Sequence, residues 1–376
     1  MRIRQLGVTR RAILTALPVV IAGIAACGGE SSSSNGASTP DPDLTTPAAS
    51  LMGAGSSFDN PFFMRAFAKY NSLNSKVTVN YNPVGSGTGV TQFQSQLVDF
   101  GATDVPMNAS DVGKAQGGAV VQVPVTIGGV AIAYNLPGVT GLKLSSDVLV
   151  KIFMGQITAW NDSAITALNP GVSLPDPGTT PLTTVHRQDS SGTTYIFTDY
   201  LSAVSPAWAS GPGKGKKVTW PGTNFLEGMQ NGGVAGKIQG LPGTIGYVEL
   251  AYALQNNFPV AQLQNKDGQY VSPTVDSVKA DASQKPNVSA SDFSIVNQPG
   301  AASYPIAGYS WVVLYEKQTN ADKGTAMVKL LDWLTHSAGQ AEAAALQYVP
   351  LPSGIQELAR TGLKTVTGPT GTPILT

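Results

Sequence analysis

The sequence alternates between strand-like and helix-like segments, and three of the joining loops are rich in Ser, Thr and Gly. These loops are Gly53–Phe58, Gly85–Gly89 and Arg187–Thr194, and each precedes a segment with helical periodicity. Strands that alternate with helices predict an α/β fold with mostly parallel sheets, in which ligands bind beyond the carboxyl ends of the strands. Hydroxyls and free backbone N–H groups at a helix N-terminus form a receptor for an oxyanion. Three such loops in one chain make anion binding the leading hypothesis.

Several segments have patterns clear enough to predict individual elements. Asp59-Asn60-Pro61 has the form of a helix start, with a capping side chain and Pro at the first position. Phe100–Asp104 predicts a short buried strand that ends at Asp104, and Thr183–His186 predicts a strand that leads into the third loop. Two further apolar strands are expected at Val120–Val125 and Val130–Tyr134. The residues expected to face inward from the first helices are Phe62, Phe63, Ala66, Phe67, Tyr70, Val90, Phe93, Leu97 and Val98.

The N-terminus has the form of an export signal rather than of folded structure. Residues 1–26 combine a basic head with the apolar run Ala12–Ala26, which is shorter than the roughly 20 residues that span a bilayer. The run ends at Cys27 in a sequence that resembles a bacterial lipobox, which predicts a lipidated cysteine. Arg10-Arg11 fits either a twin-arginine signal or an ordinary basic head. Residues 27–50 then predict a flexible tether, with folded structure from about Leu51 onward.

The charge balance excludes one class of partner. Removal of the first 26 residues takes away four Arg and no acids, which leaves a formal net charge of −4. An anion-binding protein of negative charge cannot rely on long-range attraction, so its affinity must come from local dipoles. The same balance, without basic runs, argues against nucleic acid as a partner. The only cysteine is Cys27, so no disulfide within the chain is expected.

Together these segments resemble the PstS-type phosphate-binding proteins that serve phosphate ABC transporters. The resemblance covers almost the whole chain beyond the predicted tether. It is carried by the segments Gly53–Phe58, Val84–Gly89, Asp99–Asp104, Ile127–Gly138, Gly155–Trp160, Asn169–Gly171, Arg187–Thr193, Gly243–Glu249 and Tyr348–Pro352.

The resemblance implies a fold, a ligand and a partner. The fold would be a two-lobed, type II-like periplasmic-binding-protein fold with mixed sheets, flanking helices and two hinge crossovers. Lobe I would comprise residues 51–130 and 304–376, and lobe II residues 131–303. The protein would be exported to the periplasm or cell surface and anchored to the membrane by its lipid. There it would hold inorganic phosphate between the lobes and deliver it to the permease subunits of an ABC transporter. We expect a monomer that is not an enzyme and has no cofactor or metal.

The resemblance also implies the residues that contact phosphate. Asp189 would pair with the binding arginine, Arg187. Two departures from the family pattern stand out: Ser57 is found where many members have Thr, and Gln188 and Ser190 flank Asp189 in place of smaller residues. The implied phosphate contacts are Ser57, Phe58 through its backbone, Ser86, Asp104, Arg187, Ser191, Gly192 and Thr193.

The chemistry of these residues predicts which anion is preferred. Arg187 supplies one full positive charge and binds in a two-pronged manner. Asp104 is an acid in an anion site, where it would accept the proton that hydrogen phosphate still carries. Sulfate has no such proton and would meet an unpaired negative charge. Sites built on an obligatory hydrogen bond reject analogues that lack it by about 10⁴-fold.

Other functions remain open at the level of sequence. A metallophosphatase needs clustered His, Asp or Cys ligands, and the chain has two His and one Cys. A serine hydrolase would need His186 or His336 beside a serine in a nucleophile elbow, and no Gly-x-Ser-x-Gly occurs in that context. A binding protein for another oxyanion, such as molybdate or sulfate, is the closer alternative. A surface signalling or adhesion role with bound phosphate is a third.

Overall fold

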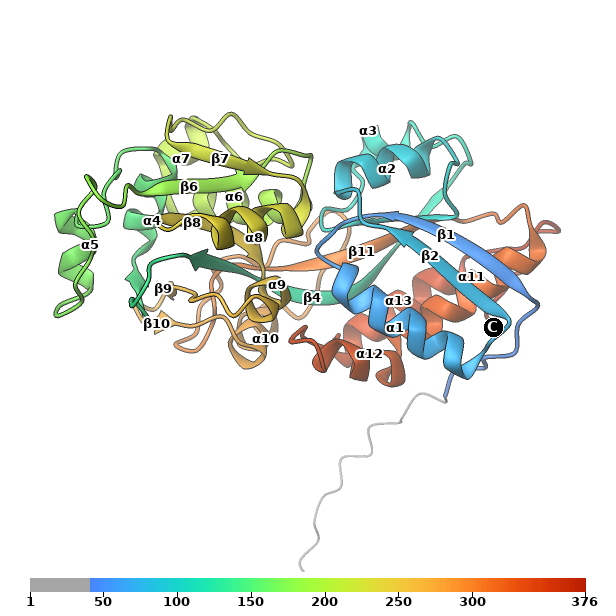
Figure 1. Ribbon diagram of the computed structural model, residues 1–376. Helices are drawn as coiled ribbons and strands as arrows, with labels where there is room; N and C mark the ends of the chain where they lie inside the picture. The colour runs from blue at the N-terminus through green and yellow to red at the C-terminus, as the bar shows by residue number, and fades with distance from the viewer. Residues whose placement is uncertain (1–40) are drawn as a thin grey trace, which may run out of the picture. The chain divides into compact units, whose positions relative to one another are not determined.

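The computed structural model describes residues 41–376 (Figure 1), so the predicted export signal, Cys27 and the tether as far as residue 40 lie outside the described residues. None of the described helices has the length and apolar character needed to cross a bilayer. The strands are β1 (Ala49–Gly55), β2 (Val77–Asn82), β3 (Phe100–Thr103), β4 (Val120–Tyr134), β5 (Lys143–Leu144), β6 (Thr183–Arg187), β7 (Phe225–Gly228), β8 (Thr244–Glu249), β9 (Gln262–Gln264), β10 (Tyr270–Val271) and β11 (Ala307–Tyr315). The helices are α1 (Asn60–Leu73), α2 (Ser86–Gln94), α3 (Ala109–Val112), α4 (Ser146–Phe153), α5 (Ser163–Leu168), α6 (Gly192–Val204), α7 (Pro206–Ser210), α8 (Gln230–Gly240), α9 (Leu250–Gln255), α10 (Val275–Ser283), α11 (Ala321–Thr335), α12 (Ser337–Ala344) and α13 (Ser353–Lys364).

Folded structure begins earlier than the sequence predicts. β1 starts at Ala49, two residues before the expected start at Leu51. Upstream of it, the side-chain amide of Asn74 donates to Leu44 O at 2.8 Å and to Thr46 Oγ1 at 2.6 Å. The predicted tether is therefore too long at its C-terminal end, because hydrogen bonds to the end of α1 and the packing of Leu44 against the core hold these residues.

Eight of the described strands form one mixed sheet in the order β2-β1-β3-β11-β4-β8-β6-β7. β1 pairs in parallel with β2 and β3, and β6 pairs in parallel with β7 and β8. Figure 1 shows helices flanking both parallel groups. The predicted class, a mixed α/β fold, is confirmed. The pairing is less parallel than the strand–helix alternation suggests, because β4 and β11 run antiparallel to their neighbours where the two groups are joined.

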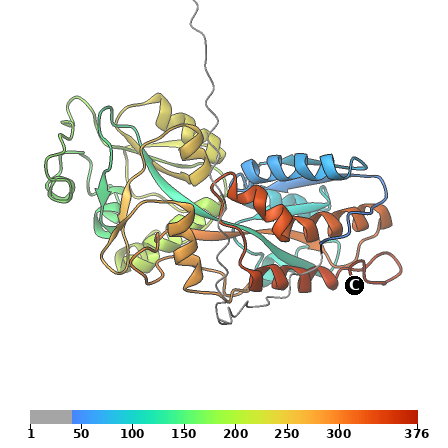
Figure 2. The ribbon, with the colours of Figure 1, turned by 90° about the horizontal axis from the view of Figure 1, so that it is seen from below.

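β4 is one continuous strand of 15 residues, where the sequence predicted two separate strands. It pairs with β11 as far as Gly129 and with β8 from Val130 onward, and Figure 2 shows it as a single long ribbon. The glycines between the predicted strands do not break it. Gly128 instead leaves room for the Phe58 ring, whose Cε1 would lie 2.6 Å from a Cβ at that position. The change of partner occurs at the predicted lobe boundary, and the division into lobes itself stays a prediction.

The alternation of side chains along β8 explains how helices cover both faces of its parallel group. Ile245 and Tyr247 point to one face, where they join the core cluster that contains Phe197 of α6. Val248 points to the other face and clusters with Val234 of α8. Both faces are therefore apolar, as expected for a parallel group that is buried on both sides.

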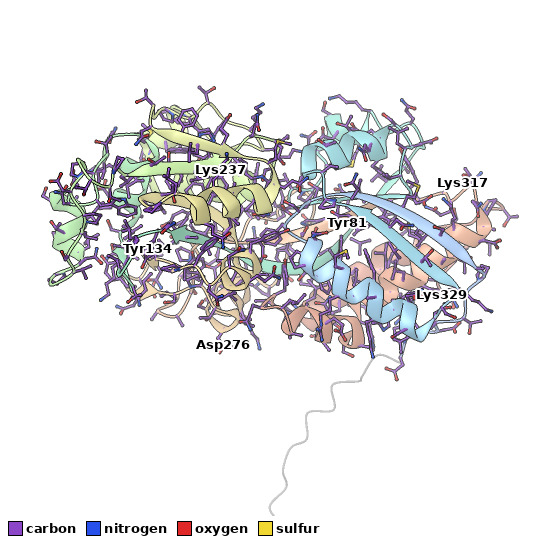
Figure 3. The ribbon with its side chains drawn as sticks, in the orientation of Figure 1. Tyr81, Tyr134, Lys237, Asp276, Lys317 and Lys329 are labelled. Atoms are coloured by element: carbon purple, nitrogen blue, oxygen red, sulfur yellow. The ribbon has the colours of Figure 1, made fainter. Side chains whose placement is uncertain are left out.

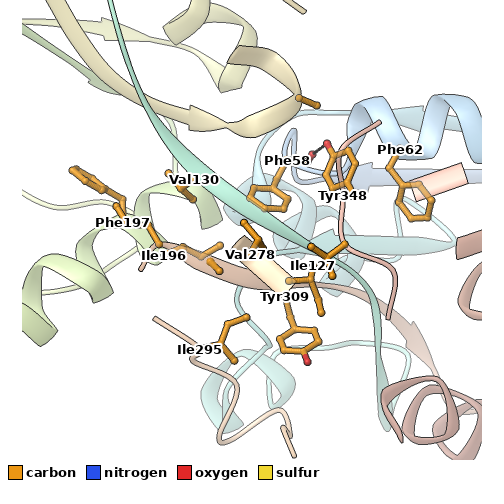
Figure 4. Close-up of a cluster of buried hydrophobic side chains, with 14 of the residues drawn as sticks. Phe58, Phe62, Ile127, Val130, Ile196, Phe197, Val278, Ile295, Tyr309 and Tyr348 are labelled. Atoms are coloured by element: carbon orange, nitrogen blue, oxygen red, sulfur yellow. Dashed lines mark hydrogen bonds between the residues drawn. The ribbon is translucent and has the colours of Figure 1, made fainter. Parts of the chain in front are cut away.

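An aromatic cluster fills the core beneath the loop Gly53–Phe58. All the residues of α1 that were predicted to face inward are buried. The ring of Phe58 meets Tyr348 edge-on with centroids 6.2 Å apart, and Tyr348 also contacts Phe62 (Figure 4). The Tyr348 hydroxyl donates to the Phe58 carbonyl, which fixes the backbone at the point where α1 begins.

Two local predictions near α1 and α2 are wrong. Asp59 lies at the N-cap of α1, but its side chain makes no capping hydrogen bond. It is fully buried and turned toward Ser310 instead. α2 ends at Gln94, so Leu97 lies beyond the helix and is 67% exposed rather than facing inward.

The histidine of β6 packs as expected. His186 is buried and stacks on Trp220 with ring centroids 4.6 Å apart. Burial lowers the pKa of His186 to about 4, so the ring is neutral at physiological pH. Trp160, Trp208 and Trp311 are likewise buried in the core.

A pair of glycine substitutions tests the packing of α2 on β1. At Gly89 of α2, a Cβ would lie 2.7 Å from the Ala54 carbonyl and closer still to Gly55, whereas at Gly236 of α8 nothing lies within 4 Å. Gly89→Ala should lower the free energy of unfolding by about 1–3 kcal/mol, because the methyl group meets backbone. Gly236→Ala should raise it by about 0.5–1 kcal/mol through helix propensity. Urea denaturation measures both, and equal changes in the two variants would contradict this packing.

Candidate functional site

Asp104 follows the carboxyl end of β3 and is 1% exposed. The Ser56 hydroxyl donates to its Oδ2 at 2.8 Å, and the Ser310 hydroxyl lies 2.8 Å from its Oδ1. The Ser86 hydroxyl lies 3.5 Å from Oδ2. Burial raises the pKa of Asp104 to about 6, and the hydroxyls and the charge of Arg187 limit that rise. Asp104 is therefore mainly ionised at neutral pH.

The loop Gly53–Phe58 places two adjacent serines on different partners. Ser56 contacts Asp104, and its hydroxyl also accepts from the Phe58 N–H at 3.0 Å. Ser57 faces α8, where its Oγ accepts from the backbone N–H of Asn231 at 3.0 Å. Tyr81 of β2, labelled in Figure 3, donates to the Ser56 carbonyl at 2.6 Å. Both serines are buried and held from several sides.

The segment Gly85–Gly89 is a loop only at Gly85, because α2 begins at Ser86 and contains the other residues that were predicted to precede it. The Ser86 hydroxyl accepts from the Gly192 N–H at 3.1 Å and from the Asp104 N–H at 3.4 Å. Gly85 has φ of +90°, which favours glycine, and a Cβ there would also collide with Asp189. The second loop thus lies against the third.

Arg187 is the last residue of β6, and it is 4% exposed. Its guanidinium makes a two-pronged ion pair with Asp189, in which Nε donates to Oδ1 at 2.8 Å and Nη2 donates to Oδ2. Burial opposes ionisation of Asp189, but the hydrogen bonds and charge of Arg187 outweigh it and lower the pKa below its usual value. Nη1 of Arg187 donates to Thr193 Oγ1 at 3.4 Å. One positive charge is therefore fixed beside the start of α6.

The start of α6 supplies the remaining groups. Ser191 is the N-cap, and its hydroxyl accepts from the Thr194 N–H at 3.1 Å. The Gly192 N–H reaches Ser86, and a Cβ on Gly192 would collide with Asp104. Thr193 Oγ1 accepts from Arg187 and from the Asn231 side chain.

A continuous network of contacts therefore connects five residues, here called the Asp104–Arg187 cluster: Asp104, Ser86, Gly192, Thr193 and Arg187. It contains an ionised carboxylate, a guanidinium, hydroxyls and the N-termini of two helices, all buried. Such a set of donors suits a small oxyanion, and the carboxylate suits one that carries a proton. Within residues 41–376, no group of three or more His, Cys, Asp and Glu is arranged to hold a metal ion.

Three residues beside the cluster are not predicted from the sequence. Ser56 adjoins Ser57, which is predicted, but the sequence of a strand-to-helix loop does not show which of the two serines faces Asp104. Asn231 and Ser310 come from α8 and β11, far along the chain. Asn231 bridges Ser57 and Thr193, and Ser310 contacts Asp104. Neither belongs to a local motif, so only the fold could identify them.

Known proteins resemble this chain in sequence and in structure. A family model described as the PBP superfamily domain matches residues 37–338. A phosphate-binding protein PstS of Xylella fastidiosa is 39% identical over 86% of this chain and 87% of its own length. A phosphate-binding protein PstS of Pasteurella multocida is 40% identical over 86% and 92%.

A solved phosphate-binding protein from Stenotrophomonas maltophilia has the same fold. Its TM-score is 0.69 at 22% identity, over 87% of this chain and 99% of that one. From these sequence and structural matches, the chain belongs to the PBP superfamily and, within it, to the PstS family.

Proposed function

We propose that this protein is an exported solute-binding protein that captures inorganic phosphate at the Asp104–Arg187 cluster. The observation that carries the proposal is an ionised, buried carboxylate connected through Ser86 and the start of α6 to a buried guanidinium. The names of the PstS relatives support phosphate as the ligand. The carboxylate can accept a proton from a ligand, and the guanidinium can pair with its negative charge. Together they favour an anion that still carries a proton.

The proposed ligand contacts follow from the donors in the cluster. Phosphate oxygens would accept from Arg187, from the hydroxyls of Ser57, Ser86, Ser191 and Thr193, and from backbone N–H groups at Phe58 and Gly192. In the described arrangement these groups bond within the protein, as the Gly192 N–H does to Ser86 at 3.1 Å and the Phe58 N–H does to Ser56 at 3.0 Å. Phosphate would take the place of these contacts, so little hydrogen bonding is lost when it binds.

Asp104 would distinguish phosphate from sulfate. Its Oδ1 faces Ser310. Its Oδ2 accepts from Ser56 and also lies beside Ser86 and Gly192, which are proposed phosphate donors, so Oδ2 is the oxygen that would accept the proton of hydrogen phosphate. Sulfate offers no proton, and its negative charge would face the carboxylate without compensation. Selectivity then comes from one obligatory hydrogen bond.

Entry of phosphate requires the cluster to open. Asp104 and Arg187 are 1% and 4% exposed, so no ion reaches them in the described arrangement. Hydrogen bonds that cross between the predicted lobes at the cluster, such as Ser57 to Asn231 and Ser86 to Gly192, would have to break. We infer that residues 51–130 with 304–376 move relative to residues 131–303 about hinges at the crossovers, and that phosphate favours the closed form.

The wider role rests on the family and on the predicted N-terminus. The protein would be exported, lipidated at Cys27 and held at the membrane by that anchor. It would deliver phosphate to the permease of an ABC transporter without chemical turnover. A binding protein for another oxyanion is the alternative, since the donors alone fit any small tetrahedral anion.

Titration calorimetry of the purified protein with phosphate, sulfate, molybdate and arsenate tests the proposal. We expect one phosphate per chain and sulfate weaker by about 10⁴-fold. Equal affinity for sulfate, or tighter binding of molybdate, would reject phosphate as the ligand. Hydrolysis of a chromogenic phosphate ester, absent from an Asp104→Asn variant, would favour an enzyme instead.

A further inference from the structure

The buried hydroxyl of Ser310 lies between two buried acids, Asp59 and Asp104. If both acids were ionised, every oxygen around this hydroxyl could only accept a hydrogen bond. Ser310 Oγ in β11 lies 2.6 Å from Asp59 Oδ2, 2.8 Å from Asp104 Oδ1 and 3.4 Å from the Thr103 carbonyl. A hydroxyl has one proton and can donate it to only one of them. At 2.6 Å, a second ionised carboxylate would place its charge against the hydroxyl lone pairs. One of the two acids must therefore donate a proton to Ser310.

The surroundings identify which acid holds that proton. Asp104 has the Ser56 hydroxyl as a further donor, and the charge of Arg187 favours its ionised form. Asp59 is 0% exposed, its Oδ1 has no hydrogen-bond partner among the described residues, and Ser310 is its only side-chain partner. Burial, reinforced by the charge of Asp104, raises the pKa of Asp59 well above its usual value. The proton belongs on Asp59.

The other groups that face the pair do not alter this assignment. Glu249 is the last residue of β8 and is also buried, and burial raises its pKa to about 8, so it adds little charge at neutral pH. The nearby tyrosines remain neutral because burial raises their pKa values above the ordinary one. Those tyrosines are Tyr81, Tyr252 and Tyr348.

We propose that Asp59 is a positioning residue that stays protonated at neutral pH and donates through Ser310 to Asp104. This inference rests on the proposed function and extends it to a residue outside the ligand contacts. The direction of donation is Asp59 Oδ2–H to Ser310 Oγ, and Ser310 Oγ–H to Asp104 Oδ1. It holds Asp104 in place, keeps its Oδ2 available for the proton of phosphate, and leaves the anion facing one negative charge instead of two.

Two substitutions at Asp59 separate this role from simple packing. Asp59→Asn keeps the shape and a donor for Ser310 but is always neutral, so phosphate affinity at neutral pH should stay within about threefold of the native value. Asp59→Ala removes the donor and should weaken binding by at least about tenfold. Calorimetry measures both, with melting curves to establish folding. If Asp59 were ionised, Asp59→Asn would instead tighten binding by at least about tenfold, which would overturn the proposal.

Infrared spectroscopy without phosphate reads the proton directly. The native protein should show the carbonyl stretch of a protonated carboxyl that Asp59→Asn removes and that Ser310→Ala shifts by deleting its partner. Asp281→Asn is the control: that acid is also buried, has an unpartnered oxygen and has its pKa raised to about 8. It should lose its own band and keep phosphate affinity. An Asp59→Asn spectrum identical to the native one would overturn the proposal. Absence of phosphate binding with the Asp59 band present would reject the proposed function alone.

Discussion

Replacing Asp104 by asparagine should remove most of the preference for phosphate over sulfate. Asp104 is buried and ionised at neutral pH, and its carboxylate only accepts hydrogen bonds. The amide of asparagine offers N–H donors to a sulfate oxygen, so sulfate no longer meets an unpaired charge. The ratio of the two dissociation constants should fall from about 10⁴ to within about tenfold. Competition titration of the two anions measures that ratio.

The matched control is Asp99, the acid at the other end of the segment Asp99–Asp104. Asp99 is partly exposed and paired with Lys323 at 2.9 Å. Asp99→Asn makes the same change of charge and should leave the ratio unchanged.

In the native protein, discrimination against sulfate should weaken as pH falls below about 6, where Asp104 gains a proton that it can donate. The asparagine variant should lack this pH dependence, and a native ratio that is constant down to pH values well below 6 would contradict the role of Asp104.

Loss of Arg187 should abolish tight phosphate binding. Its guanidinium is the cation of the Asp104–Arg187 cluster, buried and held in place by Asp189. Truncation of a buried, hydrogen-bonded charge at a binding site costs several kcal/mol, so Arg187→Met should weaken phosphate binding by about 10³-fold. The single variant also leaves Asp189 buried without its partner, which should lower the free energy of unfolding by about 3–5 kcal/mol.

A double variant separates binding from folding. Arg187→Met with Asp189→Asn removes both charges, so much of the lost stability should return while phosphate affinity stays low. Lys151→Met is the control for net charge, because Lys151 forms an exposed ion pair with Asp147 on α4. It should bind phosphate like the native protein. Tight phosphate binding by the stable double variant would show that the anion does not depend on Arg187.

The sequence was most informative where function and local structure share one short segment. Asp104 was predicted at the end of a strand, and the third loop was predicted to follow β6, because strand alternation and capping serines leave direct traces in sequence. These features depend on neighbours within a few residues.

The rest depends on contacts between distant segments. Asp59 has the pattern of a helix cap, yet Ser310 of β11 draws its side chain into the core. The glycines of β4 resemble a break between strands, but one of them makes room for Phe58. Asn231 joins the site through the packing of α8, about 40 residues after Arg187. Tertiary packing outweighs local preference at each of these positions.

The most direct measurement is a crystal structure of the protein grown with phosphate. We predict one anion between Asp104 and Arg187, with one oxygen within hydrogen-bond distance of Asp104 Oδ2 and another on the guanidinium. The N–H of Gly192 should have turned from Ser86 to the anion. Phosphate bound elsewhere, or bound to Arg187 while Asp104 still contacts only its serines, would contradict the claim that Asp104 accepts the proton of hydrogen phosphate in a hydrogen bond.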